Sequence, residues 1–175
     1  RRGPEAATLV APRKQALSII GLGGTAPTPK GGITAEVLIV SSKDELEAKA
    51  ADAKGKIVLY NAIMAEYDRE KGDGYDAVYK YRNNGADWAA KHGAVGVLVR
   101  SLTTRSLGTP HTGGVRYEGK VKLPAAAISI EGAEMLARLG ARGPVRVKLE
   151  LASERLPDAE SGNVIAELRG REKPD

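Results

Sequence analysis

Short apolar runs alternate with polar and glycine-rich stretches along this chain, and their spacing predicts its strands. Each run is bounded by glycine or by polar residues, as is typical of strands. The runs cover residues 16–22, 36–40, 56–61, 94–100, 125–130, 145–151 and 163–168. The run at 56–61 is almost continuously apolar, which indicates burial on both faces. The run at 145–151 alternates strictly, so one of its faces is expected to contact water.

Three short helices are predicted between the strands. They cover residues 42–53, the segment from Asn83 or Asn84 to His92, and residues 131–139. The first begins with a capping box, in which the Ser42 side chain accepts from the Glu45 amide while Glu45 reaches back. Trp88 is the large apolar anchor of the second helix. The mixture predicts an α/β (mixed α+β) domain with helices against a central sheet, and the alternating late strand adds an antiparallel component.

The positive charge of the chain is concentrated in one segment. The 175 residues carry 27 Lys and Arg against 22 Asp and Glu, a net charge of +5. Six of the basic residues and one acid lie between Lys91 and Lys122, so this segment alone accounts for the +5. Charge runs of this kind are usually solvated surfaces. A groove for nucleic acid would interleave aromatic residues for base stacking, and this segment offers Tyr117 alone.

Length and composition exclude several classes. The length suits one domain, and no apolar window approaches the roughly 20 residues of a membrane helix. The absence of cysteine excludes disulfides and a thiol nucleophile. The chain begins with arginine rather than methionine, which favours a fragment or a processed product.

No motif for catalysis or metal binding is complete. His92 and His111 are the two histidines, too few for a zinc site without cysteine, and no G-x-S-x-G elbow is present. Residues 21–26 match a dinucleotide fingerprint, but Pro27 and the residues after it forbid the helix that this motif requires. The acidic segment 66–76 lacks the spacing of a calcium loop and predicts an exposed loop.

His111 lies in a loop of unusual composition. Pro110 stiffens the approach to it, and Gly113 and Gly114 follow. A fixed, exposed histidine beside basic residues can bind a carboxylate or a protein partner, although an incidental loop histidine is the simpler interpretation.

Several stretches together resemble the protease-associated (PA) domain. The similarity is carried by GKIVLY at 55–60, by AAKHGAVGVL at 89–98 and by LPAAAISIEGAE at 123–134. More narrowly, GGITAEV at 31–37, PHTG at 110–113 and NVIAELRG at 163–170 resemble the PA insert of carboxypeptidase Q-type (plasma glutamate carboxypeptidase-like) di-zinc peptidases. The acidic segment 66–76 departs from the family pattern. The resemblance implies the PA-domain fold, a central mixed sheet or open barrel flanked by about three short helices.

The resemblance also implies a function. The chain is expected to be one non-catalytic domain, with a core over about residues 16–154 and a linking strand over 155–175 that leads to a catalytic domain. Zinc belongs to that catalytic domain, and this chain is expected to hold no catalytic residue, metal or cofactor. The domain would cover the active-site cleft and modulate substrate access or protein contacts in a secreted or periplasmic enzyme.

The partners that the resemblance implies are the catalytic domain of the same protein and a peptide substrate, with neither nucleic acid nor a membrane span. The predicted substrate- or partner-binding residues lie in or beside the loop 110–113. They are Arg100, Arg105, His111, Thr112 and Tyr117. Two alternatives stay open: an independent hydrolase with an atypical carboxylate site, and a weak nucleic-acid binder that uses the basic segment between Lys91 and Lys122.

Overall fold

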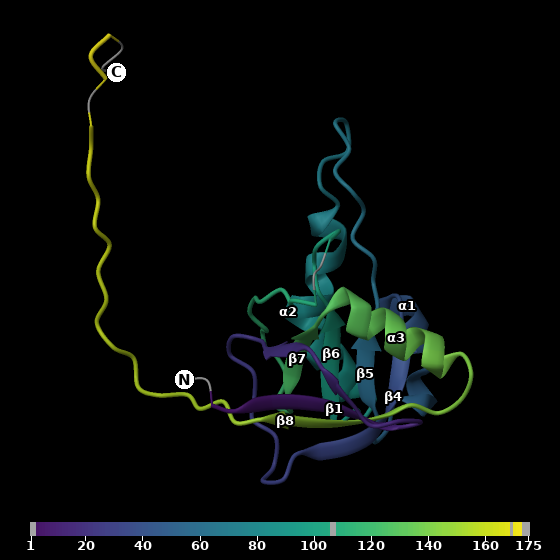
Figure 1. Ribbon diagram of the computed structural model, residues 1–175. Helices are drawn as coiled ribbons and strands as arrows, with labels where there is room; N and C mark the ends of the chain where they lie inside the picture. The colour runs from purple at the N-terminus through teal and green to yellow at the C-terminus, as the bar shows by residue number, and fades with distance from the viewer. Residues whose placement is uncertain (1–2, 106–107, 169, 173–175) are drawn as a thin grey trace.

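The strands of the chain form a single mixed sheet that curves almost into a barrel (Figure 1). The computed structural model describes residues 3–105, 108–168 and 170–172. Within this part, the strands are ordered β2-β1-β8-β4-β5-β6-β7-β3. Their bounds are β1 Glu5–Ala11, β2 Gln15–Leu17, β3 Ile19–Gly21, β4 Ile33–Val40, β5 Ile57–Tyr60, β6 Gly96–Arg100, β7 Ala125–Ile128 and β8 Arg146–Leu151. The mixed α/β architecture confirms the predicted fold class.

The two edges of the sheet are formed by consecutive strands. β2 lies at one edge and β3 at the other, yet one residue, Ser18, separates them in the chain. The chain can take this path because the sheet curls until its edges meet. Glu5 on β1 fastens this junction, since its Oε2 accepts a hydrogen bond of 2.7 Å from the Gly21 backbone amide on β3.

The parallel part of the sheet is buried on both faces. β4, β5, β6 and β7 run parallel to one another, and all four residues of β5 are buried. Val58 and Tyr60 belong to the apolar cluster beneath α2, whereas Ile57 and Leu59 belong to the cluster that includes Leu136 of α3. This arrangement confirms the two-faced burial predicted for the run at 56–61. β8 is antiparallel to β1 and β4 and buries alternate residues, as its pattern predicted.

The helices differ from the sequence prediction mainly at their ends. Their bounds are α1 Lys43–Ala48, α2 Tyr75–Lys91 and α3 Ile130–Gly140, with a 3-10 turn at Ala50–Asp52. Half of the predicted capping box of α1 forms, with Glu45 N donating to Ser42 Oγ over 3.0 Å. The Glu45 carboxylate reaches back one residue further than predicted and accepts from the Ser41 amide over 2.7 Å.

α2 begins well before Asn83, so the predicted start was wrong. Its N-cap is Gly74, which has a positive φ of 66° and no side chain to cap the helix. Asp73, one residue earlier, accepts from the Tyr75 amide over 3.0 Å instead.

Two strand predictions need correction. β1 was not predicted, and the run at 16–22 divides into β2 and β3 rather than forming one strand. The run at 163–168 forms no strand, because no other strand lies beside it in the described part of the chain. Residues 152–168 instead leave the barrel as an extended stretch (Figure 1). Its apolar residues Val164, Ile165 and Leu168 are 99%, 91% and 98% exposed.

Candidate functional site

The carboxyl ends of the parallel strands carry the two longest loops of the domain. Residues 61–74 connect β5 to α2, and residues 101–124 connect β6 to β7. Because β5 and β6 are parallel neighbours, both loops leave from the same end of the sheet, the one where these strands finish. We call this end the loop edge. In open α/β sheets, ligands bind outside the carboxyl ends of strands, so this edge is the candidate functional site.

Helix α2 holds the loop 101–124 at three points. Arg82 Nη1 donates to the Thr112 carbonyl oxygen over 3.2 Å, and the Arg116 amide donates to Asn83 O over 2.9 Å. Further along the helix, Asp87 Oδ2 accepts from the backbone amides of Glu118 and Gly119, at 2.6 and 3.3 Å. The stretch from Thr112 to Gly119 therefore has a defined path, although the described residues of the loop form no strand or helix.

The barrel fastens the same loop from the other side. Gly23 N donates to Gly113 O over 2.7 Å, and Val115 N donates to Gly23 O over 2.9 Å. Residues 113 and 115, just after His111, are thus hydrogen-bonded to Gly23 in the turn that follows β3. These two hydrogen bonds fix the loop, which was predicted to be stiff because of Pro110.

His111 itself is exposed, with a defined ring orientation. Its backbone amide donates to Ser101 Oγ over 2.8 Å, and its Nδ1 lies 3.0 Å from the Leu102 carbonyl oxygen. A carbonyl oxygen can only accept, so Nδ1 carries the proton of this hydrogen bond. In the neutral ring, Nε2 is then the unprotonated acceptor. Thr112 and Arg105, the neighbouring residues predicted to bind a partner, are also exposed.

Tyr117 braces the loop from within. Its hydroxyl donates to Leu123 O and accepts from the Ala26 amide over 3.2 Å, and the ring is half-buried. This burial raises the pKa of the Tyr117 phenol. The structure therefore gives Tyr117 a bracing contact, and the side chain does not extend beside His111 into solvent.

Arg100 lies inside the domain, although the sequence placed it with the binding residues. It ends β6 and is 6% exposed. Its guanidinium donates to Glu134 Oε1 on α3 over 3.0 Å and to Asn61 Oδ1 over 3.1 Å. It thus joins the end of β6 to α3 and to the residue after β5. The exposed cations of the basic segment are Lys91, Arg105, Arg116, Lys120 and Lys122.

Sequence reasoning missed Arg82. Its guanidinium lies 5.5 Å from the centre of the Tyr75 ring and donates to the Tyr75 hydroxyl. It thereby joins the first turn of α2 to the Thr112 carbonyl. The 75/79/82 spacing on one helical face was the available signal, but it required the correct helix start.

The acidic segment 66–76 forms a tight turn that projects from the loop edge (Figure 1). Asp68 and Gly72 pair through their backbones, and Asp68 Oδ1 accepts from the amides of Glu70 and Lys71 at 2.9 Å each. Ile63 and Tyr67 on this projection are 72% and 73% exposed. In the described part of the chain, no group of three or more His, Cys, Asp or Glu could hold a metal ion. No helix within the same residues is long and apolar enough to cross a bilayer.

Across the described residues, the fold is a curled mixed sheet flanked by three α-helices, with its two longest loops at the carboxyl ends of β5 and β6. The sequence pattern of the PA domain matches residues 7–136, and the chain belongs to the PA domain family. It is 46% identical to carboxypeptidase Q of Xenopus laevis and 41% identical to that of Homo sapiens, each over 176 aligned residues that cover 99% of this chain. The chain spans 36% of the length of these relatives.

Solved structures agree with this assignment. A peptidase M28 precursor from Shewanella amazonensis superposes with a TM-score of 0.82 at 38% identity, over 89% of this chain and 36% of that one. A zinc aminopeptidase from Bacillus subtilis superposes with a TM-score of 0.55 over 86% of this chain and 32% of its own. At 24% identity, the second similarity shows the fold alone. The predicted PA-domain fold is thus confirmed.

Proposed function

We propose that this chain is a non-catalytic PA domain of a larger zinc-dependent exopeptidase. In that protein it covers the active-site cleft and modulates substrate access or protein contacts, while zinc and catalysis belong to another domain. The observation that carries the proposal is the alignment of 99% of this chain with 36% of carboxypeptidase Q. A chain that aligns along its whole length with about a third of an enzyme is expected to act as one domain of such an enzyme.

The loop edge supports a binding role. His111, Thr112 and Arg105 are exposed on a loop whose backbone is held by α2 and by the turn after β3. A surface held in one conformation binds at a low entropic cost, because little order is lost on association. Exposed cations at its rim attract a peptide carboxylate and speed its encounter with the site.

The extended segment after β8 supports the presence of a partner domain. Val164, Ile165 and Leu168 fall within five residues and are nearly fully exposed. Such a cluster of aliphatic side chains is normally covered by other protein. We place this cover in the catalytic domain, and we place the whole enzyme in the secreted or periplasmic compartment on the family resemblance.

The test uses the full-length protein that contains this chain. His111→Ala and Arg105→Ala are expected to raise KM for peptides with a free carboxylate and to leave bound zinc unchanged. Lys54→Ala, at an exposed residue before β5, is the matched control for loss of a surface cation. An unchanged kcat/KM for every peptide in both variants would contradict the proposal. Peptidase activity of the 175-residue chain alone, measured with and without added zinc, would favour the independent hydrolase instead.

A further inference from the structure

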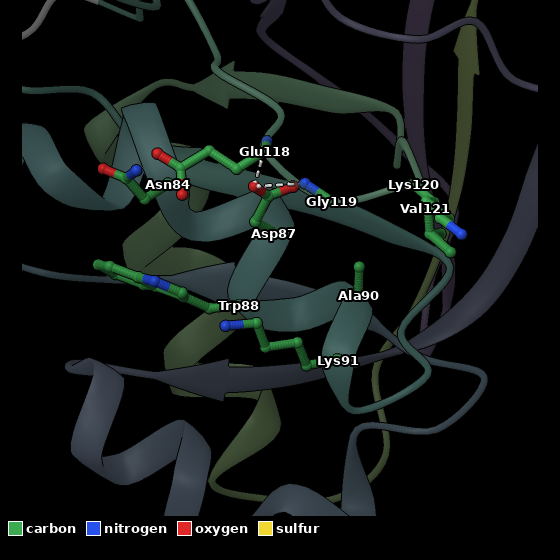
Figure 2. Close-up of a pocket in the computed structure, with 9 residues that line it drawn as sticks. All are labelled: Asn84, Asp87, Trp88, Ala90, Lys91, Glu118, Gly119, Lys120 and Val121. Carbon is green, nitrogen blue, oxygen red and sulfur yellow. Dashed lines mark hydrogen bonds between the residues drawn. The ribbon is translucent and has the colours of Figure 1, made fainter.

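The outer face of α2 and the end of the loop 101–124 enclose a second concave site, whose lining shares no residue with the loop 110–113 (Figure 2). The cavity has a volume of about 370 Å³, within the range of small-molecule sites. It is lined by Asn84, Asp87, Trp88, Ala90, Lys91 and residues 118–121. Its ligand class can be inferred from these side chains independently of the function proposed above.

An aromatic ring provides the apolar part of the cavity. Trp88 is partly buried, and its ring meets Tyr60 and Tyr81 edge-on, at centroid distances of 6.4 and 6.1 Å. These two buried rings and the Lys43 ammonium, 5.2 Å from the centre of the indole, hold the Trp88 ring in place before any ligand arrives. Val121, across the cavity, is 57% exposed. Figure 2 draws the Trp88 ring at one end of the cavity and Val121 at the other, so the aromatic contact for a ligand is Trp88.

A carboxylate forms the inner wall. Asp87 is 8% exposed, and the two loop amides that it accepts both bond to Oδ2. Its other oxygen, Oδ1, has no hydrogen-bond partner among the described residues. Oδ1 is buried beneath Gly119, so Asp87 contributes its negative charge to the cavity rather than an open acceptor. The exposed Glu118 side chain lies on the same side in Figure 2, so this side attracts a cation.

Two lysines provide the opposite charge at the mouth. Lys91 and Lys120 are exposed, and neither forms an ion pair with any other described residue. In Figure 2, Lys91 lies across Trp88 from Asp87 and Glu118. The cavity thus presents two carboxylates and two ammonium groups around an apolar centre. A ligand with one charge would satisfy only half of this arrangement.

We propose that this cavity binds a free amino acid or short peptide in its zwitterionic form, with an apolar side chain. The ligand ammonium faces Glu118 and the negative charge of Asp87 behind it, its carboxylate faces Lys91, and its side chain packs on Trp88. Free amino acids and short peptides share this chemistry, and the length of the ligand is an outcome of the test.

The chain contains one tryptophan, so its fluorescence reports on this cavity alone. The 175-residue chain is titrated with leucine and with Leu-Leu, and in parallel with N-acetyl-Leu-Leu and Leu-Leu-amide. A saturable change of Trp88 emission is expected with at least one of the two free zwitterions. Each blocked analogue is expected to bind about tenfold more weakly, since it loses one of two charge-assisted contacts.

Variants test which side chains bind the ammonium end of the ligand and which bind its carboxylate end. Glu118→Gln and Asp87→Asn should each weaken zwitterion binding and reduce its sensitivity to N-acetylation. Lys91→Met with Lys120→Met should weaken binding and reduce its sensitivity to amidation. Lys122→Met removes an exposed lysine that does not line the cavity and should change nothing. If Asp87→Asn fails to fold, Glu118→Gln and the lysine pair still test the proposal.

Three results would overturn it. The first is the absence of any saturable change with leucine or Leu-Leu up to tens of millimolar. The second is equal affinity for free and blocked peptides, which would define a purely apolar contact. The third is tight binding of Leu-Leu-amide with none of its free form, which would define a cation site.

Discussion

Tyr60 at the end of β5 donates a hydrogen bond to the Gly85 carbonyl oxygen in the middle of α2, over 2.8 Å. The Tyr60 ring lies against this glycine so closely that a Cβ built on Gly85 would be 2.6 Å from the ring carbon Cε2. The contact sets how closely α2 approaches the sheet. Desolvation of the hydroxyl raises the pKa of Tyr60, so the phenol stays protonated and keeps donating.

Gly85→Ala should therefore destabilise the domain. Alanine gains about 1 kcal/mol of helix propensity over glycine, but the added methyl group overlaps a buried ring that has no room to move. We expect a net loss of about 1–3 kcal/mol in the free energy of unfolding, measured by urea denaturation. Asn84→Ala, one residue earlier and only partly buried, is the control and should change stability little. A Gly85→Ala variant as stable as the parent would show that α2 can shift outward.

The sequence predicts some elements of the fold well and misses others. The buried strands and α3 follow from apolar runs and glycine boundaries, and they lie within a few residues of their predicted bounds. The first half of α2 was missed because its N-cap is a glycine and half of residues 75–82 are exposed. β1 was missed because its sequence EAATLVA alternates only partly and depends on β8 and β2 for pairing.

The part of the candidate site that could be predicted is the part formed by residues close together in the sequence. The fixed loop around His111 followed from Pro110 and the glycines. Arg82 was not found, because its role rests on Thr112, 30 residues away, and so on the packing of α2. Arg100 has the composition of a surface cation, and its burial at the end of β6 becomes evident only when α3 is placed over it.

The start of α1 should make stability depend on pH. The Lys49 ammonium, and then the amide and hydroxyl of Ser41, lower the pKa of Glu45 from 4.5 to about 2. A depressed carboxylate pKa stabilises the fold above the unfolded-state value, and this stabilisation is lost as the pH falls from about 4.5 toward 2. Glu45→Gln should therefore be less stable than the parent at neutral pH and nearly equal to it near pH 2. Urea titrations at both pH values measure this convergence.

Lys49→Met provides the matched control for that assignment. Removing the ammonium that lies 2.7 Å from Glu45 Oε1 should raise the pKa of Glu45 toward its ordinary value, which NMR titration of the carboxyl carbon detects. A pKa for Glu45 that stays near 2 in this variant would assign the shift to Ser41 instead.

The junction between the sheet edges should depend on Glu5. Glu5→Ala removes the acceptor for the Gly21 amide and should cost about 1–2 kcal/mol in the free energy of unfolding. Glu5→Gln retains an oxygen that can accept the same bond, so it should lose less. Equal losses in the two variants would show that the charge of Glu5 matters and the hydrogen bond does not.

Arg82 should hold the loop that carries His111 in place. Arg82→Leu keeps good helix propensity but removes the donor to Thr112 O and the contact with Tyr75. We expect amide exchange at Val115 and Arg116 to become about fivefold faster, which corresponds to about 1 kcal/mol of lost local stability, while the buried strands keep their protection. Lys80→Leu on the same helix is the control, because Lys80 lies over the Tyr81 ring instead. If exchange at these two amides does not change in Arg82→Leu, the grip of Gly23 alone holds the loop, and mutations at α2 should then leave any function of His111 intact.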